Sequence, residues 1–253
     1  MHSDVFLARA ALPKNIKVQD MLSCHLQQLG SLVADRPLWF PSFNYSFTRT
    51  GVYDPQKDIS EVGALTEYAR THWATWRKGP PVFHFIGKNT HVADLPEVGE
   101  VDPFDQHSLF AQLHQQRGQL LFYGAGFHCC TAIHYVERLF GGLAYRYDKI
   151  FSGIVKRGTS ELPVALTYHC RPLGQHLDYD WPKLLEDLKA QGMITEIVSQ
   201  GSVASIVAMS DLVDLWLSKL KVDPLYLLDE PSRKWVAPRL HQLGRRFLHT
   251  DFE

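Results

Sequence analysis

The chain has 253 residues, of which 45% are hydrophobic and 12% aromatic, so it is long enough to bury a sizeable core. Its 26 basic and 27 acidic side chains give a formal net charge of -1, which excludes the electrostatic footprint of a nucleic-acid-binding protein. No apolar run reaches the roughly 18–20 residues of a membrane span, and residues 1–12 lack a signal-peptide pattern. Because 4 cysteines make no disulfide framework here, the composition indicates a reduced, cytoplasmic enzyme.

Strand and helix patterns alternate along the first half of the chain. The expected elements are, in order, a strand at 4–8, a helix at 16–34, a strand at 37–43 that leaves its sheet at Pro41, a helix at 61–76 capped by Ser60, a strand at 82–87, a helix at 108–116, a strand at 119–123 and a helix that follows it. This alternation predicts an α/β fold with parallel strand pairs.

The second half has a different pattern but contains no internal repeat and no low-complexity linker. It predicts paired strands at 144–156 and 162–170, a helix at 181–191, β-structure over 193–209, a helix at 211–221 capped by Ser210, and a tail over 229–253 that packs late or docks on a neighbour. We expect a single domain over residues 1–253, with a subdomain seam near Gly141 and Gly142.

The most informative stretch is QLLFYGAGFHCCTAIHYVE at 119–137, in which Thr131, His134 and Glu137 follow one another at three-residue spacing. Such spacing places side chains on one stripe of a helix. A carboxylate one turn away can orient an imidazole and stabilise its protonated form, as a general base requires. An ordinary helix face with a solvated glutamate is the alternative, but the helix follows a strand end, where α/β proteins form their sites.

Other residues of this stretch allow further interpretations. Gly124 and Gly126 fit an anion-binding turn or a tight packing turn, although Cys129 breaks the dinucleotide fingerprint. His128 and the adjacent cysteines suggest zinc, but neighbouring helical cysteines point apart and no second pair exists, so no metal is expected. A cysteine nucleophile at Cys129 or Cys130 is possible, whereas cysteine on an apolar helix is usually inert.

Two loops carry polar groups suited to a ligand. The loop PSFNYSF offers Ser42 and Tyr45 after a strand, either for a polar ligand or for turn formation. Asp178 and Asp180, in GQHLDYDW, could receive a cationic amine, although Asp180 also suits the cap of the helix that contains Pro182.

Several segments, taken in order, resemble the aminoglycoside 3-N-acetyltransferase family, which is distinct from the GNAT fold. The matching segments are PSFNYSF (41–47), GVYDP (51–55), SEVGALTEYAR (60–70), PFDQHSLFAQL (103–113), QLLFYGAGFHCCTAIHYVE (119–137) and QGSVASIVAMSDLVDLWLSKLKVDPLYLL (200–228). The resemblance covers roughly residues 4–228 and implies an α/β/α sandwich around a mixed sheet. It also implies transfer of an acyl group, in most cases acetyl, from acyl-coenzyme A to an amine.

The resemblance assigns roles to particular residues. His134 would be the general base, with Glu137 orienting it and Thr131 completing the catalytic motif. Tyr45, Asp178 and Asp180 are the candidates for binding the acceptor. The segments expected around acetyl-coenzyme A or another acyl-coenzyme A supply Ser42, Gly63, Ala64, Leu65, Thr66, Ser108 and Arg9.

Two segments depart from the family pattern. Arg9, Ala10 and Ala11 stand where the family has a histidine and two serines, and residues 77–81 lack the histidine and serine of its R-S-x-H-P segment. An arginine can still meet a coenzyme phosphate. We therefore expect an acyltransferase of a small amine, an amino sugar of glycan biosynthesis rather than an aminoglycoside drug, acting without nucleic acid and possibly as a homodimer. A non-catalytic scaffold that has lost coenzyme A is the rival hypothesis.

Overall fold

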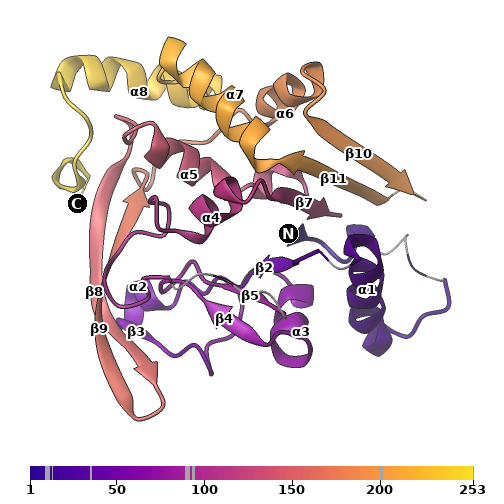
Figure 1. Ribbon diagram of the computed structural model, residues 1–253. Helices are drawn as coiled ribbons and strands as arrows, with labels where there is room; N and C mark the ends of the chain where they lie inside the picture. The colour runs from indigo at the N-terminus through magenta and orange to yellow at the C-terminus, as the bar shows by residue number, and fades with distance from the viewer. Residues whose placement is uncertain are drawn as a thin grey trace.

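The computed structural model describes residues 1–8, 12, 14–34, 36–88, 92, 95–199 and 202–252. Helices and strands are distributed along the whole of this described chain (Figure 1). The helices are α1 (Val18–Val33), α2 (Phe47–Thr50), α3 (Ala64–His72), α4 (Leu109–Gln115), α5 (Ala132–Leu139), α6 (Trp181–Ala190), α7 (Met209–Val222) and α8 (Glu230–Leu243). The strands are β1 (His2–Ser3), β2 (Trp39–Pro41), β3 (Val52–Tyr53), β4 (Trp76–Lys78), β5 (Phe85–Gly87), β6 (Gly99–Val101), β7 (Gln119–Tyr123), β8 (Tyr147–Arg157), β9 (Ser160–Cys170), β10 (Ile194–Ser199) and β11 (Ser202–Ala208).

The described strands form three small sheets, with the orders β1-β7-β11-β10, β2-β5-β4 and β3-β8-β9-β6. Parallel pairing joins β1 to β7, β3 to β8 and β6 to β9, and the remaining pairs are antiparallel. The expected mixed α/β fold is confirmed, with its strands divided among these sheets. In the described part of the chain, no helix is long and apolar enough to cross a bilayer.

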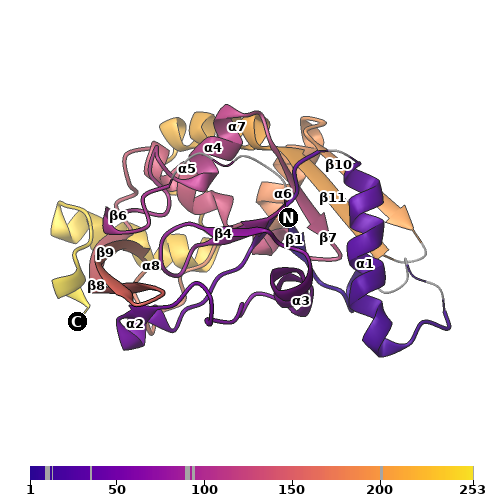
Figure 2. The same ribbon diagram turned by 60° about the horizontal axis from the view of Figure 1, so that its bottom comes forward.

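The β8–β9 hairpin runs along one side of the molecule, from the region of α5 and α8 to that of α2 (Figure 1). Helix α1 lies at the far side from this hairpin (Figure 2). The strands pair antiparallel from Tyr147 opposite Cys170 to Arg157 opposite Ser160. This register places the residues at the start of β8 beside those at the end of β9, next to α5.

The end of β7 is shaped by a glycine that no other residue could replace without strain. Gly124 has a φ of +68°, and a Cβ there would lie 2.3 Å from the carbonyl oxygen of Asp4. The segment after β1 therefore crosses directly over this turn. Beyond it, a short 3-10 helix at Phe127–Cys129 leads into α5, so the strand–glycine–helix arrangement expected from the sequence is confirmed.

The strand predicted at residues 4–8 was wrong. The strand β1 ends at Ser3, and the Asp4 side chain accepts hydrogen bonds from the backbone N–H of Phe6 and Leu7 at 3.0 and 3.2 Å. The N–H of Ala8 then donates to the Asp4 carbonyl at 3.0 Å. Local bonds to an aspartate compete with a strand ladder, and here they turn the chain.

The helix predicted at 61–76 is shorter than expected. It begins after Gly63, whose φ is +108°, and Ser60 makes no cap, because its N–H donates to Glu67 at 2.7 Å. Its C-terminal part is lost because residues from Trp76 onward pair with β5. The cap predicted at Ser210 was also wrong, since α7 begins at Met209 with Ala208 before it. Pro41 remains inside β2 as its last residue.

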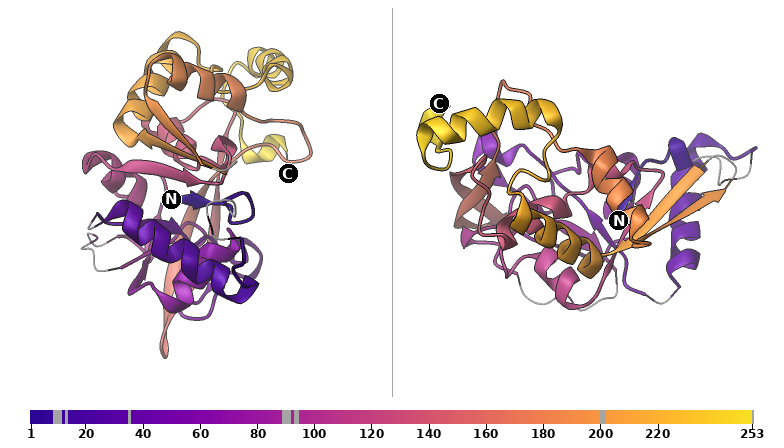
Figure 3. Two further views of the ribbon diagram at one scale, coloured as in Figure 1. Left: turned by 90° about the vertical axis from the view of Figure 1, so that its right-hand side faces the viewer. Right: turned by 90° about the horizontal axis from the view of Figure 1, so that it is seen from above.

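The C-terminal tail packs on its own chain. Helix α8 lies at the periphery of the molecule in both views of Figure 3. After it, Phe247 is fully buried, its N–H donates to the carbonyl of Ala144 at 2.8 Å, and its ring meets that of Trp235 edge to face. The tail thus covers the segment that connects α5 with β8.

Candidate active site

His134 lies in the first turns of α5, on the helix that follows β7. Burial of the neighbouring Ile133, Tyr135 and Val136 fixes the apolar face of this helix against the core. The His134 ring keeps a quarter of its surface exposed and contacts the ring of Phe104 edge to face, with centroids 5.2 Å apart. The helix therefore presents one imidazole at the edge of an otherwise closed core.

His134 and Glu137 form the hydrogen-bonded pair that the sequence predicted. The imidazole Nδ1 lies 3.0 Å from Glu137 Oε2. Because a carboxylate accepts, this contact assigns the proton to Nδ1 and leaves the Nε2 lone pair as the basic site. Within the described residues, no hydrogen bond occupies Nε2.

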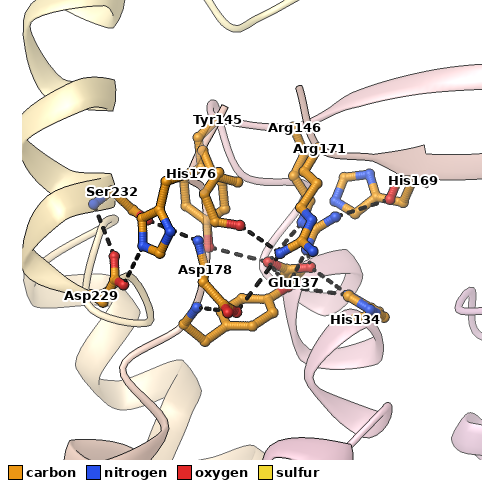
Figure 4. Close-up of polar contacts among 12 residues, drawn as sticks. His134, Glu137, Tyr145, Arg146, His169, Arg171, His176, Asp178, Asp229 and Ser232 are labelled. Carbon is orange, nitrogen blue, oxygen red and sulfur yellow. Dashed lines mark hydrogen bonds and ion pairs between the residues drawn. The ribbon is translucent and has the colours of Figure 1, made fainter. Parts of the chain in front are cut away.

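Glu137 is completely buried, and the structure surrounds its carboxylate with donors (Figure 4). The guanidinium of Arg146 approaches both carboxylate oxygens, at 2.9 and 2.8 Å. The hydroxyls of Tyr145 and Tyr179 donate to Oε1 at 3.1 and 2.8 Å. Burial by itself would raise the pKa of Glu137, but the charge of Arg146 and the bond to His134 hold this pKa well below its usual range.

Tyr179 and Arg146 connect the buried carboxylate to the rest of the site. Arg146 donates to the Tyr179 hydroxyl, which also lies 3.2 Å from His134 Nδ1, and to the backbone carbonyl of His169 at 3.1 Å. His169 in turn contacts Asp148 at 2.9 Å through Nδ1. The base is therefore held by a network that comes from α5, the start of β8, the end of β9 and the segment before α6.

The sequence-based analysis missed Arg146, Tyr145 and Tyr179. The available signal was an arginine flanked by aromatic residues in LAYRY, since a charge in an apolar run needs a buried partner. The pairing of that arginine with Glu137 depends on how α5 and β8 pack.

The environment favours the neutral form of His134. Burial and the nearby charge of Arg146 lower the pKa of His134 from its ordinary value of 6.5, and Glu137 only partly offsets them. The imidazole is therefore unprotonated at neutral pH and available to accept a proton.

His134 opens onto a cavity of about 780 Å³. The described residues lining it are Tyr45, Thr48, Phe83, Phe104, His128, His134, Arg146, Tyr147, Lys149, Phe151, Tyr168, His169, Cys170, Arg171, Leu173, Asp178, Tyr179 and Trp181. Its size is that of a small-molecule site. Among the sequence-predicted residues, it brings together His134, Tyr45 and Asp178.

Thr131 does not take part in this network. It precedes the first residue of α5, and its hydroxyl donates to the carbonyl of Cys129 at 3.4 Å. The described hydrogen bonds join Thr131 to His134 only through the backbone, from the His134 N–H to the Thr131 carbonyl. Its contribution is to the local fold of the helix start.

The residues predicted to contact coenzyme A lie outside the described lining of the cavity. Ser42 is fully buried, and its hydroxyl has no hydrogen-bond partner in the described part of the chain. Residues 63–66 form the start of α3, where the first N–H groups of a helix remain available to an anion. An unpaired hydroxyl and a helix start fit a phosphate-bearing ligand, and Arg9 lies outside the described residues.

Ser108 and Asp180 both act as helix caps. Ser108 Oγ accepts from the Ala111 N–H at 3.1 Å at the start of α4, and an Asp180 carboxylate oxygen accepts from the Lys183 N–H at 3.1 Å at the start of α6. Neither residue is among the described lining of the cavity. The capping alternative for Asp180 is thereby confirmed.

Replacement of Asp180 with alanine is expected to destabilise the protein by about 1 kcal/mol, because it removes a helix N-cap. Equilibrium urea unfolding measures this loss. Asp180→Asn is the matched control, since asparagine caps helices as well as aspartate does. A loss as large in Asp180→Asn as in Asp180→Ala would show that the charge, rather than the cap, supplies the stabilisation.

The two adjacent cysteines are poor nucleophiles. Cys130 is buried, and burial raises the pKa of its thiol to about 12. Cys129 is exposed, but partial burial and the charge of Asp4 raise its pKa as well. The thiolate is the reactive form, so these environments disfavour a covalent cysteine mechanism. Among the described residues, no cluster of three metal-ligating side chains is found.

Alkylation should distinguish the two thiols. We expect iodoacetamide to modify Cys129 in the native protein near neutral pH while Cys130 stays unmodified, because Cys130 is both inaccessible and protonated. Peptide mass spectrometry before and after unfolding in denaturant checks this result. Rapid native labelling of Cys130 would contradict it and restore the cysteine mechanism.

Comparison with solved structures gives the same fold in aminoglycoside acetyltransferases. A histidine-to-alanine mutant of aminoglycoside acetyltransferase AAC(3)-IVa in complex with gentamicin has a TM-score of 0.69 at 18% identity, over 92% of this chain and 85% of that one. Aminoglycoside acetyltransferase AAC(3)-Xa has a TM-score of 0.69 at 15% identity, over 89% and 86%. AAC-IIIb with CoASH has a TM-score of 0.57 at 20% identity, over 67% of this chain and 65%, or just under two thirds, of its own length.

Comparison with curated proteins gave no match. The family model for aminoglycoside 3-N-acetyltransferase, in contrast, matches residues 35–221, which is most of the chain and includes the His134–Glu137 pair. This chain therefore belongs to the aminoglycoside 3-N-acetyltransferase family.

Proposed function

We propose that this protein is an acyl-coenzyme-A-dependent N-acyltransferase that acetylates an amine, with His134 as its general base. The observation that carries the proposal is the neutral His134 held by buried Glu137 at the edge of a ligand-sized cavity. Family membership supports the reaction class.

The chemistry requires a base because an amine is protonated near neutral pH and an ammonium cannot attack a thioester. His134 Nε2 accepts that proton, and the freed nitrogen forms the amide bond to the acyl carbon as the carbon–sulfur bond breaks. The departing thiolate takes one proton from the imidazolium, and the second amine proton passes to solvent. When bound, the acyl donor supplies an activated carbonyl and a good leaving group.

The surrounding residues have distinct roles in this proposal. Glu137 keeps the Nδ1 proton in place, while Arg146 and Tyr179 hold the Glu137 carboxylate in its orientation. Ser42, the start of α3 at residues 63–66 and Arg9 are proposed for the coenzyme. Tyr45 and Asp178, which line the cavity, are proposed for the acceptor.

An amino sugar is the proposed acceptor class. The printed relatives include complexes with aminoglycosides, which are amino sugars linked together. Here, however, Asp178 is the one carboxylate among the described lining residues of the cavity, and a polycationic drug favours an acidic cleft. A single sugar amine fits this lining better than a drug with many ammonium groups.

The test combines ligand binding and turnover. Acetyl-coenzyme A at 100 times its Kd should stabilise the protein by roughly 2.7 kcal/mol, seen as a thermal shift that varies with acyl length. Release of free thiol with a panel of amino sugars then measures transfer. Absence of both a thermal shift and thiol release would overturn the proposal and favour the scaffold hypothesis that the altered segments at 9–11 and 77–81 suggest.

A further inference from the structure

The cavity beside His134 carries more positive than negative charge. Arg146, Lys149 and Arg171 line it, against the single described lining carboxylate of Asp178. Arg146 is neutralised by buried Glu137 at 2.8 Å, and Asp178 lies 3.7 Å from Arg171. After these pairings, the charge that remains on the lining is the ammonium of Lys149, which also lies 5.5 Å from the ring centroid of Phe151.

Arg171 is placed to meet a ligand. It follows β9, is about half exposed (48%), and uses Nη1 for the Leu177 carbonyl at 2.5 Å and for Asp178. In the hydrogen bonds of the described residues, its Nε and Nη2 groups have no partner. Since a guanidinium presents donors in a fork that matches a carboxylate or phosphate, Arg171 retains a face for such an anion.

The remaining walls are aromatic. Phe83 and Phe151 pack on the ring of Tyr168, with centroids 5.3 and 5.9 Å away, and all three line the cavity. Aromatic faces stack on sugar rings and planar bases but provide no counter-charge for several ammonium groups. A lining of this kind suits a ligand with one amine and one anionic group.

We propose that the acceptor is an anionic amino sugar, whose phosphate or carboxylate is bound by Arg171 and Lys149 while its amine reaches His134. This inference rests on the proposed acyltransferase function and narrows its substrate class. It excludes a polycation as the preferred acceptor. The same cationic groups could instead bind the phosphates of coenzyme A, so the experiment must separate the two sources of anion.

The experiment measures thiol release from acetyl-coenzyme A with matched acceptors: glucosamine, its 1-phosphate and 6-phosphate, a nucleotide-linked glucosamine, and a tetra-amine aminoglycoside. We expect kcat/KM for at least one anionic acceptor to exceed that for glucosamine about 10-fold or more, the effect of one charged hydrogen bond. A higher kcat/KM for the aminoglycoside than for every anionic acceptor would overturn the inference and leave the acyltransferase function intact. No thiol release with any amine would instead count against the function itself.

Charge reversal locates the anion site. Arg171→Glu should lower kcat/KM for the anionic acceptor by about 10-fold or more and raise it for the aminoglycoside. Lys234→Glu on α8 changes the net charge equally at an exposed ion pair outside the cavity lining, and should leave both values unchanged. If Arg171→Glu instead raises KM for acetyl-coenzyme A but not for an acetyl-pantetheine donor that lacks phosphates, the anion belongs to the coenzyme and the inference fails.

Discussion

Replacement of His134 with asparagine is expected to lower kcat by about 10²- to 10⁴-fold, the usual contribution of a positioned general base. Asparagine can still donate to Glu137, so the buried carboxylate keeps a partner and the fold is maintained. Steady-state thiol release with saturating acetyl-coenzyme A measures the effect. The thermal shift caused by acetyl-coenzyme A should persist, because His134 acts on the acceptor amine.

The pH dependence gives an independent test of the same assignment. Burial and Arg146 place the pKa of His134 below its ordinary value of 6.5, so kcat should be constant at neutral pH and fall as pH drops through that lower pKa. His134→Asn should lose this acid limb while retaining a low, pH-insensitive rate. An acid limb of unchanged position in the variant would assign the titration to another group and remove His134 from the role of base.

Replacement of Arg146 with methionine is expected to destabilise the protein by about 3–5 kcal/mol at neutral pH, because it leaves the buried Glu137 charge without its cation. Without Arg146, burial raises the pKa of Glu137 above its ordinary value of 4.5. The unfolded state then loses its proton more readily than the folded state, so the deficit should shrink as pH falls towards 4.5. Urea unfolding at neutral and acidic pH measures both effects.

The double variant Glu137→Gln with Arg146→Met is the control for this experiment. It removes both charges, so it should recover much of the stability that Arg146→Met loses, while kcat stays low because His134 has lost its carboxylate. A double variant as unstable at neutral pH as Arg146→Met would show that the loss comes from the packing of Arg146 rather than from its charge.

Local patterns were sufficient for the elements that carry their own signals. The β8–β9 hairpin, helices α4 and α6 with their caps, and the turn at Gly124 were all predicted, because hydrophobic periodicity, side-chain caps and positive φ are encoded within a few residues. Predictions failed where distant contacts compete with local preference. The chain from Trp76 onward leaves the predicted helix to pair with β5, and Asp4 turns the chain across Gly124.

For the site, the sequence by itself determined the His134–Glu137 pair, since both residues lie on one helix three positions apart. Only the tertiary structure decided how that pair is held and what it faces. Arg146, Tyr179 and Arg171 come from the start of β8, the segment before α6 and the end of β9, and the packing of α5 against these segments assembles them. Spacing along one helix fixes which side chains share a face, whereas burial of a carboxylate with its partners depends on segments that meet only in the folded chain.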